Sequence, residues 1–231
     1  KEKNGNSDIE DRRWFAKEAF AVSSAYDSAI FSYFDTGVNS ALRVTAGSGK
    51  TLRYGENPHQ KGIFYGNFSE AFEQLHGKEI SYNNLLDIDA AVSLIADFDE
   101  TALAILKHNN ACGMACRDTV KEAWEAALAA DPISAFGGIV VTNRPVDAEA
   151  AKAINEIFFE VIIAPDFLPD ALAILSQKKN RIILKQKLIV GEVNNLMIRS
   201  ALNGFLVQDR DTAVQTRQDL TVVTEKSPTE K

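Results

Sequence analysis

The part of the chain from about residue 60 onward alternates between short apolar runs and longer segments with helical periodicity, and this alternation strongly limits the possible folds. Strands regularly exchanged with helices predict βαβ units and a layered α/β sheet. We expect strands at 62–66, 101–106, 137–142, 160–164, 181–184 and 204–209, and helices at 85–98, 118–130, 146–159 and 168–177.

A separate, long amphipathic helix is predicted from Asp11 to about Asp35. We expect this helix to pack on something outside the chain. Both ends of the sequence are polar, so we expect a piece of a longer polypeptide. The apolar positions of the helix recur at helical spacing and are Trp14, Phe15, Ala19, Val22, Tyr26, Ile30 and Phe34.

Composition excludes several classes of protein. A formal net charge of −7 disfavours wholesale binding to nucleic acid, although a local basic pocket for a phosphate is compatible with it. The two cysteines, Cys112 and Cys116, do not make a disulfide framework and favour a reducing, cytoplasmic setting. No apolar run approaches the roughly 20 residues that span a bilayer.

The stretch LAILKHNNACG, residues 103–113, ends an apolar run on four polar side chains. A solvated polar turn is one interpretation. A catalytic strand end is another, because the C-terminal edges of strands in open α/β sheets form ligand crevices. There Lys107 could stabilise an oxyanion, and a neutral His108 could take a proton near pH 7.

A metal site is a third interpretation of the same stretch. His108, Cys112 and Cys116 recur every four residues, which would place them on one face of a helix. Zinc sites use such ligands. However, Gly113 interrupts a helix and no acidic residue adjoins His108, so we expect the cysteines to be small packing residues.

Three further polar loops accompany this stretch. RYGENPHQ (53–60) carries groups that can bind phosphate, SYNNLLD (81–87) has a capping-like Asn before a helix, and DPISAFGG (131–138) has glycines that let the backbone approach a ligand. Each could be structural by itself. Together they favour a functional site.

In this order, RYGENPHQ, SYNNLLDIDAA, KHNNACG, DPISAFGGIVV, EVIIAPDF and KKNRIIL resemble the family of bifunctional purine-biosynthesis proteins. These proteins combine 5-aminoimidazole-4-carboxamide ribonucleotide (AICAR) formyltransferase with IMP cyclohydrolase. The resemblance covers nearly the whole chain from about Trp14. It implies that residues 1–45 are the tail of the cyclohydrolase domain with a linker, and that residues 46–231 are the first part of the formyltransferase domain. That domain would be a layered αβα fold, similar to cytidine deaminases.

The resemblance also implies the reaction. A formyl group would move from the co-substrate 10-formyltetrahydrofolate to the 5-amino group of AICAR, and the cyclohydrolase half would close the ring to IMP. No catalytic metal, nucleic acid or membrane is implied, and the enzyme would be a homodimer. Because this chain is incomplete in that view, the isolated segment could be inactive.

Carried over position by position, the resemblance makes His108 the base and Lys107 the group that stabilises the oxyanion or assists the leaving folate nitrogen. The implied substrate-binding residues are Arg53, Tyr54, His59, Asn84, Phe136, Gly137 and Glu160.

One residue departs from the family pattern. The family usually has proline where this chain has Ala111, and alanine restores a backbone N–H and releases the loop. Two rival interpretations stay open: a nucleotide-binding module without turnover, and a zinc deaminase of related fold.

Overall fold

A computed structural model describes residues 3, 5–35, 41–187, 196–211, 213 and 215–229. The chain divides into two compact units, Lys1–Lys50 and Thr51–Lys231. The first contains a long helix and the second a mixed six-stranded sheet with flanking helices, so the predicted α/β class is confirmed. Within the described part of the chain, no helix combines the length and the apolar character that crossing a membrane requires.

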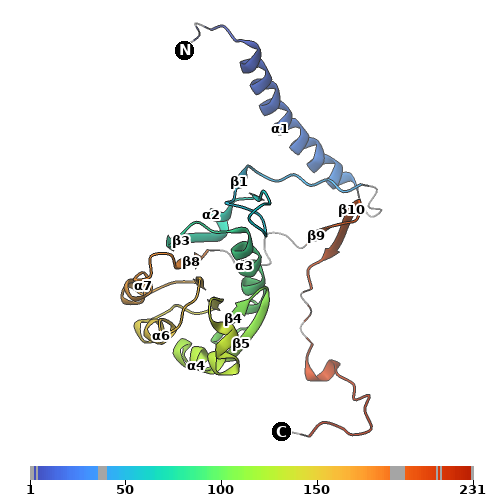
Figure 1. Ribbon diagram of the computed structural model, residues 1–231. Coiled ribbons are helices and arrows are strands. Elements are labelled where there is room, and N and C mark those ends of the chain that lie inside the picture. The colour runs from blue at the N-terminus through green and yellow to red at the C-terminus, as the bar shows by residue number, and fades with distance from the viewer. Residues whose placement is uncertain are drawn as a thin grey trace. The chain divides into compact units, whose positions relative to one another are not determined.

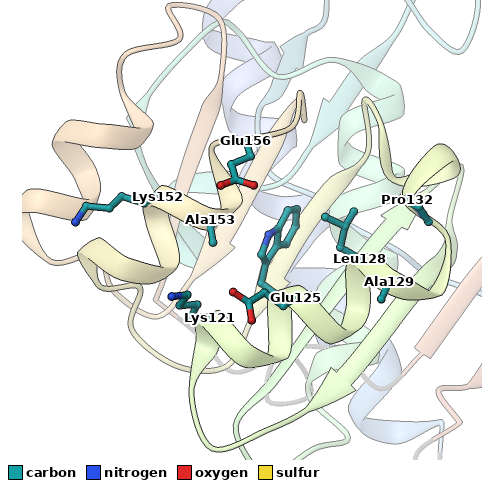
Figure 2. A pocket seen from close by; sticks show the side chains of 9 residues that line it. Lys121, Glu125, Leu128, Ala129, Pro132, Lys152, Ala153 and Glu156 are labelled. Atoms are coloured by element: carbon teal, nitrogen blue, oxygen red, sulfur yellow. The ribbon is translucent and has the colours of Figure 1, made fainter.

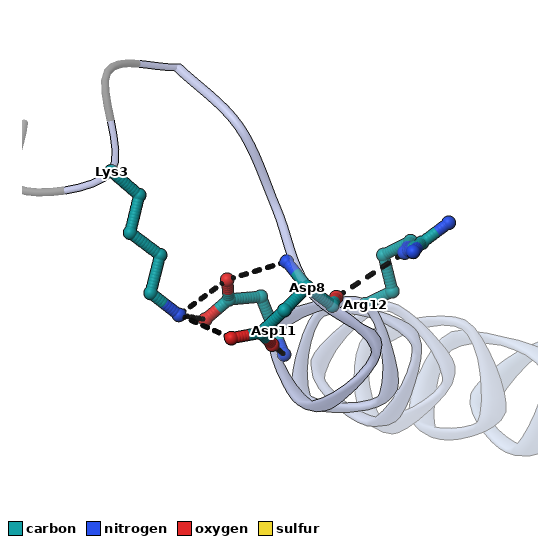
Figure 3. Close-up of polar contacts among 4 residues, drawn as sticks. All are labelled: Lys3, Asp8, Asp11 and Arg12. Atoms are coloured by element: carbon teal, nitrogen blue, oxygen red, sulfur yellow. Dashed lines mark hydrogen bonds and ion pairs between the residues drawn. The ribbon is translucent and has the colours of Figure 1, made fainter.

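Helix α1 (Ile9–Phe34) dominates the first unit and begins at a well-formed cap. The Asp8 carboxylate accepts the Asp11 backbone N–H, and the Asp11 carboxylate accepts the Asp8 N–H in return, which satisfies two donors of the first turn. Lys3 Nζ lies 2.7 Å from a carboxylate oxygen of each aspartate (Figure 3). Hydrogen bonds from Lys3 lower the pKa values of both carboxyl groups.

The apolar face of α1 has little contact within its own unit. No residue of α1 is buried, and Trp14, Phe15 and Phe34 are each more than half exposed. The Arg43 guanidinium lies 5.0 Å from the centre of the Phe31 ring. The helix is therefore confirmed at the predicted place, while its predicted packing outside the chain stays a prediction.

The second unit is built on one sheet with the strand order β3-β8-β7-β6-β4-β5. Figure 1 labels β3, β8, β4 and β5 of this sheet. Strands β6, β7 and β8 are parallel and are joined by α6 and α7, which confirms two of the expected βαβ units. Strand β4 is antiparallel to both of its neighbours. The six strands are β3 (Phe72–His76), β4 (Ala102–Lys107), β5 (Asn110–Cys116), β6 (Ile139–Thr142), β7 (Val161–Ala164) and β8 (Ile182–Gln186).

Helices cover both faces of this sheet. Helices α4 (Val120–Ala130), α6 (Ala148–Ile154) and α7 (Pro169–Leu175) pack on one face, and α3 (Tyr82–Ile95) packs on the other. Residues that alternate along a strand enter opposite cores: Ile105 faces Trp124 and its neighbours, whereas Ala104 belongs to the cluster with Ile88. The central strands are therefore apolar throughout, as expected for a sheet buried on both sides.

Smaller elements complete the fold. Strands β9 and β10 form an antiparallel pair, and β1 pairs with β2. Their bounds and those of the short helices are β1 (Gly49–Thr51), β2 (Ile63–Tyr65), α2 (Phe68–Ala71), α5 (Pro132–Ala135), β9 (Leu196–Ala201), β10 (Gly204–Asp209) and η1 (Arg217–Asp219).

Four strands, β1, β3, β5 and β9, were not among those predicted. The β3 sequence FEQLH is half polar, and the β5 sequence NACGMAC consists largely of small residues, so neither has the β-branched composition that marks a strand. Both are outermost strands of the sheet, where one side needs no partner. The remaining predicted elements are present, with helix 146–159 shortened to α6.

We predict that Gly113→Ala destabilises the second unit. A Cβ at this position of β5 would collide with the carbonyl oxygen of Ala127 in α4, so strand and helix would have to separate. The expected loss is about 1–3 kcal/mol of unfolding free energy, measured by urea denaturation. Gly204→Ala is the control, because its new Cβ would meet nothing within 4 Å. Equal stability of the two variants would contradict the packing argument.

Candidate functional site

The polar stretch KHNN forms the turn between β4 and β5. Lys107 pairs with Asn110, which leaves His108 and Asn109 as a two-residue connection. Their φ angles are 52° and 63°, so both occupy the left-handed region that a type I′ hairpin requires. Asn tolerates this conformation better than most residues, which accounts for its place in the turn.

Three hydrogen bonds stabilise this turn. Two connect it to other segments of the chain, and one lies within the turn. Lys107 Nζ donates to the Phe136 carbonyl oxygen at 2.9 Å, and the Asn109 N–H donates to Asp87 Oδ1 at 2.7 Å. Asn110 Nδ2 donates to the His108 carbonyl oxygen at 2.8 Å. The turn is therefore tied both to the loop before β6 and to helix α3.

A cavity of about 480 Å³ lies at this turn and gathers most of the predicted site. It contains seven of the nine residues expected to take part in function, although they come from five separate segments of sequence. The lining residues are Arg53, Tyr54, Lys78, Glu79, Ile80, Ser81, Asn83, Asn84, Asp87, Lys107, His108, Gly137, Ile139 and Glu160.

Glu160 is the centre of a small polar network in the cavity. Its Oε2 accepts from Lys78 Nζ at 2.9 Å and from Asn84 Nδ2 at 3.3 Å. The backbone at Glu160 is held between two strands, because its N–H donates to Gly138 and its carbonyl oxygen accepts from Ile182. The carboxylate therefore has a defined position at the start of β7.

Asn84 is buried and also belongs to the cap of α3. The Ser81 hydroxyl accepts the Asn84 N–H at 3.1 Å, and Asn84 Oδ1 accepts the Ser81 N–H at 3.3 Å. The capping residue is thus Ser81 and not the predicted Asn. The Asn84 amide connects the cap of α3 to Glu160 and therefore fixes the helix against the cavity.

The loop RYGENPHQ contributes Arg53 and Tyr54 to the cavity. The Arg53 guanidinium lies 5.6 Å from the centre of the Tyr54 ring. Gln60 closes the loop, since its carbonyl oxygen accepts from Gly55 at 2.8 Å and its side-chain oxygen accepts from Asn57 at 2.7 Å. His59 lies on the exposed part of this loop and does not line the cavity.

Phe136 and Gly137 belong to the segment between α5 and β6, which is bonded to the turn through Lys107. The Phe136 ring is exposed and packs 5.4 Å from Phe158, so it is the Phe136 carbonyl that reaches the site, through Lys107. Gly137 has φ 78° and donates its N–H to Phe158. A side chain there would be strained, which explains the glycine at the wall of the cavity.

The position of the cavity differs from the expected strand edge. It lies at the C-terminal end of β4, as predicted, but at the N-terminal ends of β6 and β7, where Ile139 and Glu160 lie. The reason is that β4 runs antiparallel to β6, so the two strands bring opposite ends to the same edge. The rule for parallel sheets therefore does not locate this site.

The two cysteines are unsuited to a shared metal site. Cys112 and Cys116 lie on strand β5, not on a helix, so residues four apart are separated by about 13 Å along the strand. Burial raises the pKa of the Cys112 thiol, and the Asp131 carboxylate adds to this effect, which disfavours a thiolate. Among the described residues, no cluster of three or more His, Cys, Asp or Glu could hold a metal ion.

Other hollows contain fewer candidate groups. One of about 450 Å³ lies between α4 and α6 and contains none of the predicted site residues. Its lining includes the charged residues Lys121, Glu125, Lys152 and Glu156 (Figure 2). A smaller one of about 240 Å³ shares Lys78 and Glu160 with the candidate site. Its further lining residues are Phe158, Phe159, Lys178, Lys179, Asn180 and Arg181.

Sequence reasoning missed Lys78 and Asp87. Lys78 follows Gly77 after β3, a half-polar strand that was not predicted, and Asp87 lies inside a helix. Asp87 does occur in the quoted SYNNLLD motif, and its place one helical turn after Asn84 was a usable signal.

An α/β domain with lysine, histidine and glutamate around one polar cavity is typical of an enzyme or nucleotide-binding domain, and the comparisons narrow this class. The chain matches the AICARFT/IMPCHase bienzyme family over residues 1–231 and belongs to that family. It is 61% identical over 228 residues to the bifunctional purine biosynthesis protein PurH of Bacteroides thetaiotaomicron, and 48% identical over 237 residues to PurH of Rhodospirillum rubrum.

These alignments cover 99% and 98% of this chain but 45% of each relative. A third relative, PurH of Chloroflexus aurantiacus, is 45% identical over 230 residues, again with 45% of its length covered. The chain therefore spans a little under half the length of these proteins.

We predict that Ala111→Pro leaves the unfolding free energy within about 1 kcal/mol of the original. Lys107 and Asn110 close the turn as a hydrogen-bonded pair, so by alternation the Ala111 N–H points away from β4, on the outermost strand. Asn110→Pro is the control, because it removes the N–H that closes the turn. If Ala111→Pro were the more damaging variant in urea denaturation, the assigned strand register would be wrong.

Proposed function

We propose that this chain carries part of the AICAR formyltransferase site of a bifunctional purine-biosynthesis enzyme. The observation that carries the proposal is the single cavity that brings Lys107 and His108 together with Arg53, Tyr54, Asn84, Gly137 and Glu160 in a member of this family. The complete protein would use 10-formyltetrahydrofolate as co-substrate and would also cyclise the product to IMP.

Within that protein, residues 1–45 would be the tail of the cyclohydrolase domain and a linker, and residues 46–231 the first part of the formyltransferase domain. The division between compact units falls close to this boundary, after Lys50. The helices on both faces of the mixed sheet support the proposal of a cytidine-deaminase-like αβα subdomain. The complete enzyme would be a cytoplasmic homodimer, with sites that involve residues outside this chain.

The chemistry requires a base, a cation and a defined orientation. The 5-amino group of AICAR attacks the formyl carbon, a new C–N bond forms, and the carbonyl oxygen becomes an oxyanion. The amine is weakly nucleophilic because it is conjugated with its ring, so His108 as base removes its proton. The oxyanion then re-forms the carbonyl, the bond to folate N10 breaks, and that nitrogen takes the proton that His108 removed, with Lys107 assisting the transfer.

Lys107 suits the role of the cation that stabilises the oxyanion, because the position of its ammonium is fixed. Its ammonium donates one hydrogen bond to Phe136, and an ammonium has three donors, so it can also donate to a developing oxyanion. The same anchor keeps the long side chain from sampling other rotamers. Catalysis by this pair would need neither a metal nor a covalent nucleophile.

The rest of the cavity suits a nucleotide. Arg53 and Tyr54 would contact the nucleotide. Lys178 and Lys179, which line the neighbouring hollow, would be further cations for the phosphate of that nucleotide. Asn84, Phe136 and Gly137 would lie around the aminoimidazole, and Glu160 would contact the nucleotide. His59 would need to approach from its exposed loop, because it lies outside the cavity in this structure.

We predict that Lys107→Ala and His108→Ala each abolish formyl transfer in the complete protein but spare ring closure. His108→Ala removes the proposed base, and Lys107→Ala removes the proposed cation for the oxyanion. A positioned group of either kind contributes about 10²–10⁴-fold to the rate of the chemical step. Formyl transfer and IMP formation from the formylated nucleotide would be assayed separately. Near-normal formyl transfer in either variant would contradict the assigned role.

A nucleotide-binding module without turnover is the second candidate for this segment, favoured by its span of less than half of its relatives. Calorimetric titration of the segment with AICAR, beside a formyl-transfer assay of segment and complete protein, separates the two. Binding by the segment with turnover by the complete protein alone would identify a partial site. Absence of turnover in both would reject the enzyme proposal.

A further inference from the structure

Asp87 touches the catalytic turn from a different element of the fold. Its Oδ1 accepts the backbone N–H of Asn109 at 2.7 Å, a short hydrogen bond from a main-chain donor to a carboxylate. Asn109 directly follows His108, so the bond acts next to the proposed base. Asp87 also lines the cavity and is half-buried.

The backbone conformation of this turn depends on contacts from outside the turn. His108 and Asn109 are both non-glycine residues in the left-handed region, a conformation that persists when the surroundings hold it. The turn closes a hairpin whose second strand, β5, is the outermost strand of the sheet. Its far side is therefore not fixed by a further strand of this sheet.

His108 depends on its backbone for its position. Among the described residues, no hydrogen bond to the His108 imidazole is found, and the side chain is exposed. Its flanking residues, by contrast, are both anchored: Lys107 to the Phe136 carbonyl and Asn109 to Asp87. These two contacts restrain the turn from which the imidazole projects.

Helix α3 provides a rigid base for the Asp87 contact. Ser81 and Asn84 cap its first turn, and Ile88, Ala91 and Val92 are buried against the sheet. Asp87 adjoins Ile88 in the sequence, so its backbone moves little unless the core is disturbed. A contact from such an element fixes the turn better than one from another loop.

We propose that Asp87 is a positioning residue, which holds the His108–Asn109 turn so that His108 reaches the substrate amine. This inference rests on the proposed formyl-transfer function. The group that matters is the acceptor oxygen of Asp87, more than its charge. The distinction can be tested, because asparagine keeps an acceptor oxygen at the same place and alanine does not.

The test uses Asp87→Ala, Asp87→Asn and the control Asp89→Ala in the complete protein. Asp89 lies on the same helix and loses a carboxylate as well, but its recorded partner is Arg210 at 3.8 Å, away from the turn. We expect Asp87→Ala to lower kcat of formyl transfer by about 100-fold, since misplacement by ~1 Å can cost that much. KM for AICAR should change much less, and ring closure should not change.

Asp87→Asn is expected to recover most of the rate and to turn over at least about tenfold faster than Asp87→Ala, because a neutral acceptor gives a weaker but equally placed hydrogen bond. Asp89→Ala should behave as the original protein. If Asp87→Asn is as slow as Asp87→Ala, the charge matters and the positioning inference is wrong. The positioning inference is also wrong if Asp87→Ala keeps the kcat of the original protein.

Hydrogen exchange supplies a readout that does not depend on activity. In Asp87→Ala, the amide of Asn109 should exchange faster, while amides of β6 and α4 should keep their protection. Unchanged exchange at Asn109 would overturn the inference even if the rate of formyl transfer fell. If Asp87→Ala lost protection throughout the domain, it would be misfolded, and Asp87→Asn would decide the question instead. An inactive original protein with the expected change at Asn109 would instead reject formyl transfer and leave the support of the turn intact.

Discussion

Burial of one sheet on both faces is the constraint on which the rest of this structure depends. The strands β4, β6, β7 and β8 are apolar on both sides because helices cover each face, so polar groups can gather only where the strands end. At one such edge, Lys107 is the last residue of β4, Glu160 directly precedes β7, and Gly137 lies two residues before β6. The apolar sheet therefore fixes the backbone from which the polar site projects.

The site is held by hydrogen bonds between elements that are distant in sequence. Glu160 accepts from Lys78 and Asn84, Lys107 donates to Phe136, and Asp87 accepts from the turn at Asn109. These contacts involve side chains that line the cavity, so the groups that stabilise the site are also those that a ligand would meet. Such a prearranged set of polar groups is suited to the orienting role that we propose for the cavity.

The strongly periodic elements were predictable from the sequence because their composition reports burial directly. The long helix α1, the apolar strands β6 to β8 and helices α3 and α4 all lie where their periodicity places them. The edge strands β3 and β5 were not predictable, because few of their residues favour strands. They form because each pairs with one neighbouring strand and, in β5, because small residues allow close packing. Gly113 of β5 illustrates this, because its lack of a side chain admits the backbone of α4.

By itself, the sequence determined the α/β class and the polar character of KHNN. The family resemblance named seven residues that line the cavity, whereas His59 and the Phe136 ring lie outside it. The tertiary structure decided three further things. It made β4 antiparallel, it made KHNN a hairpin turn, and it brought Lys78 and Asp87 to the site. Strand direction and contacts between helix and turn depend on packing between distant segments, and local patterns of residues do not record that packing.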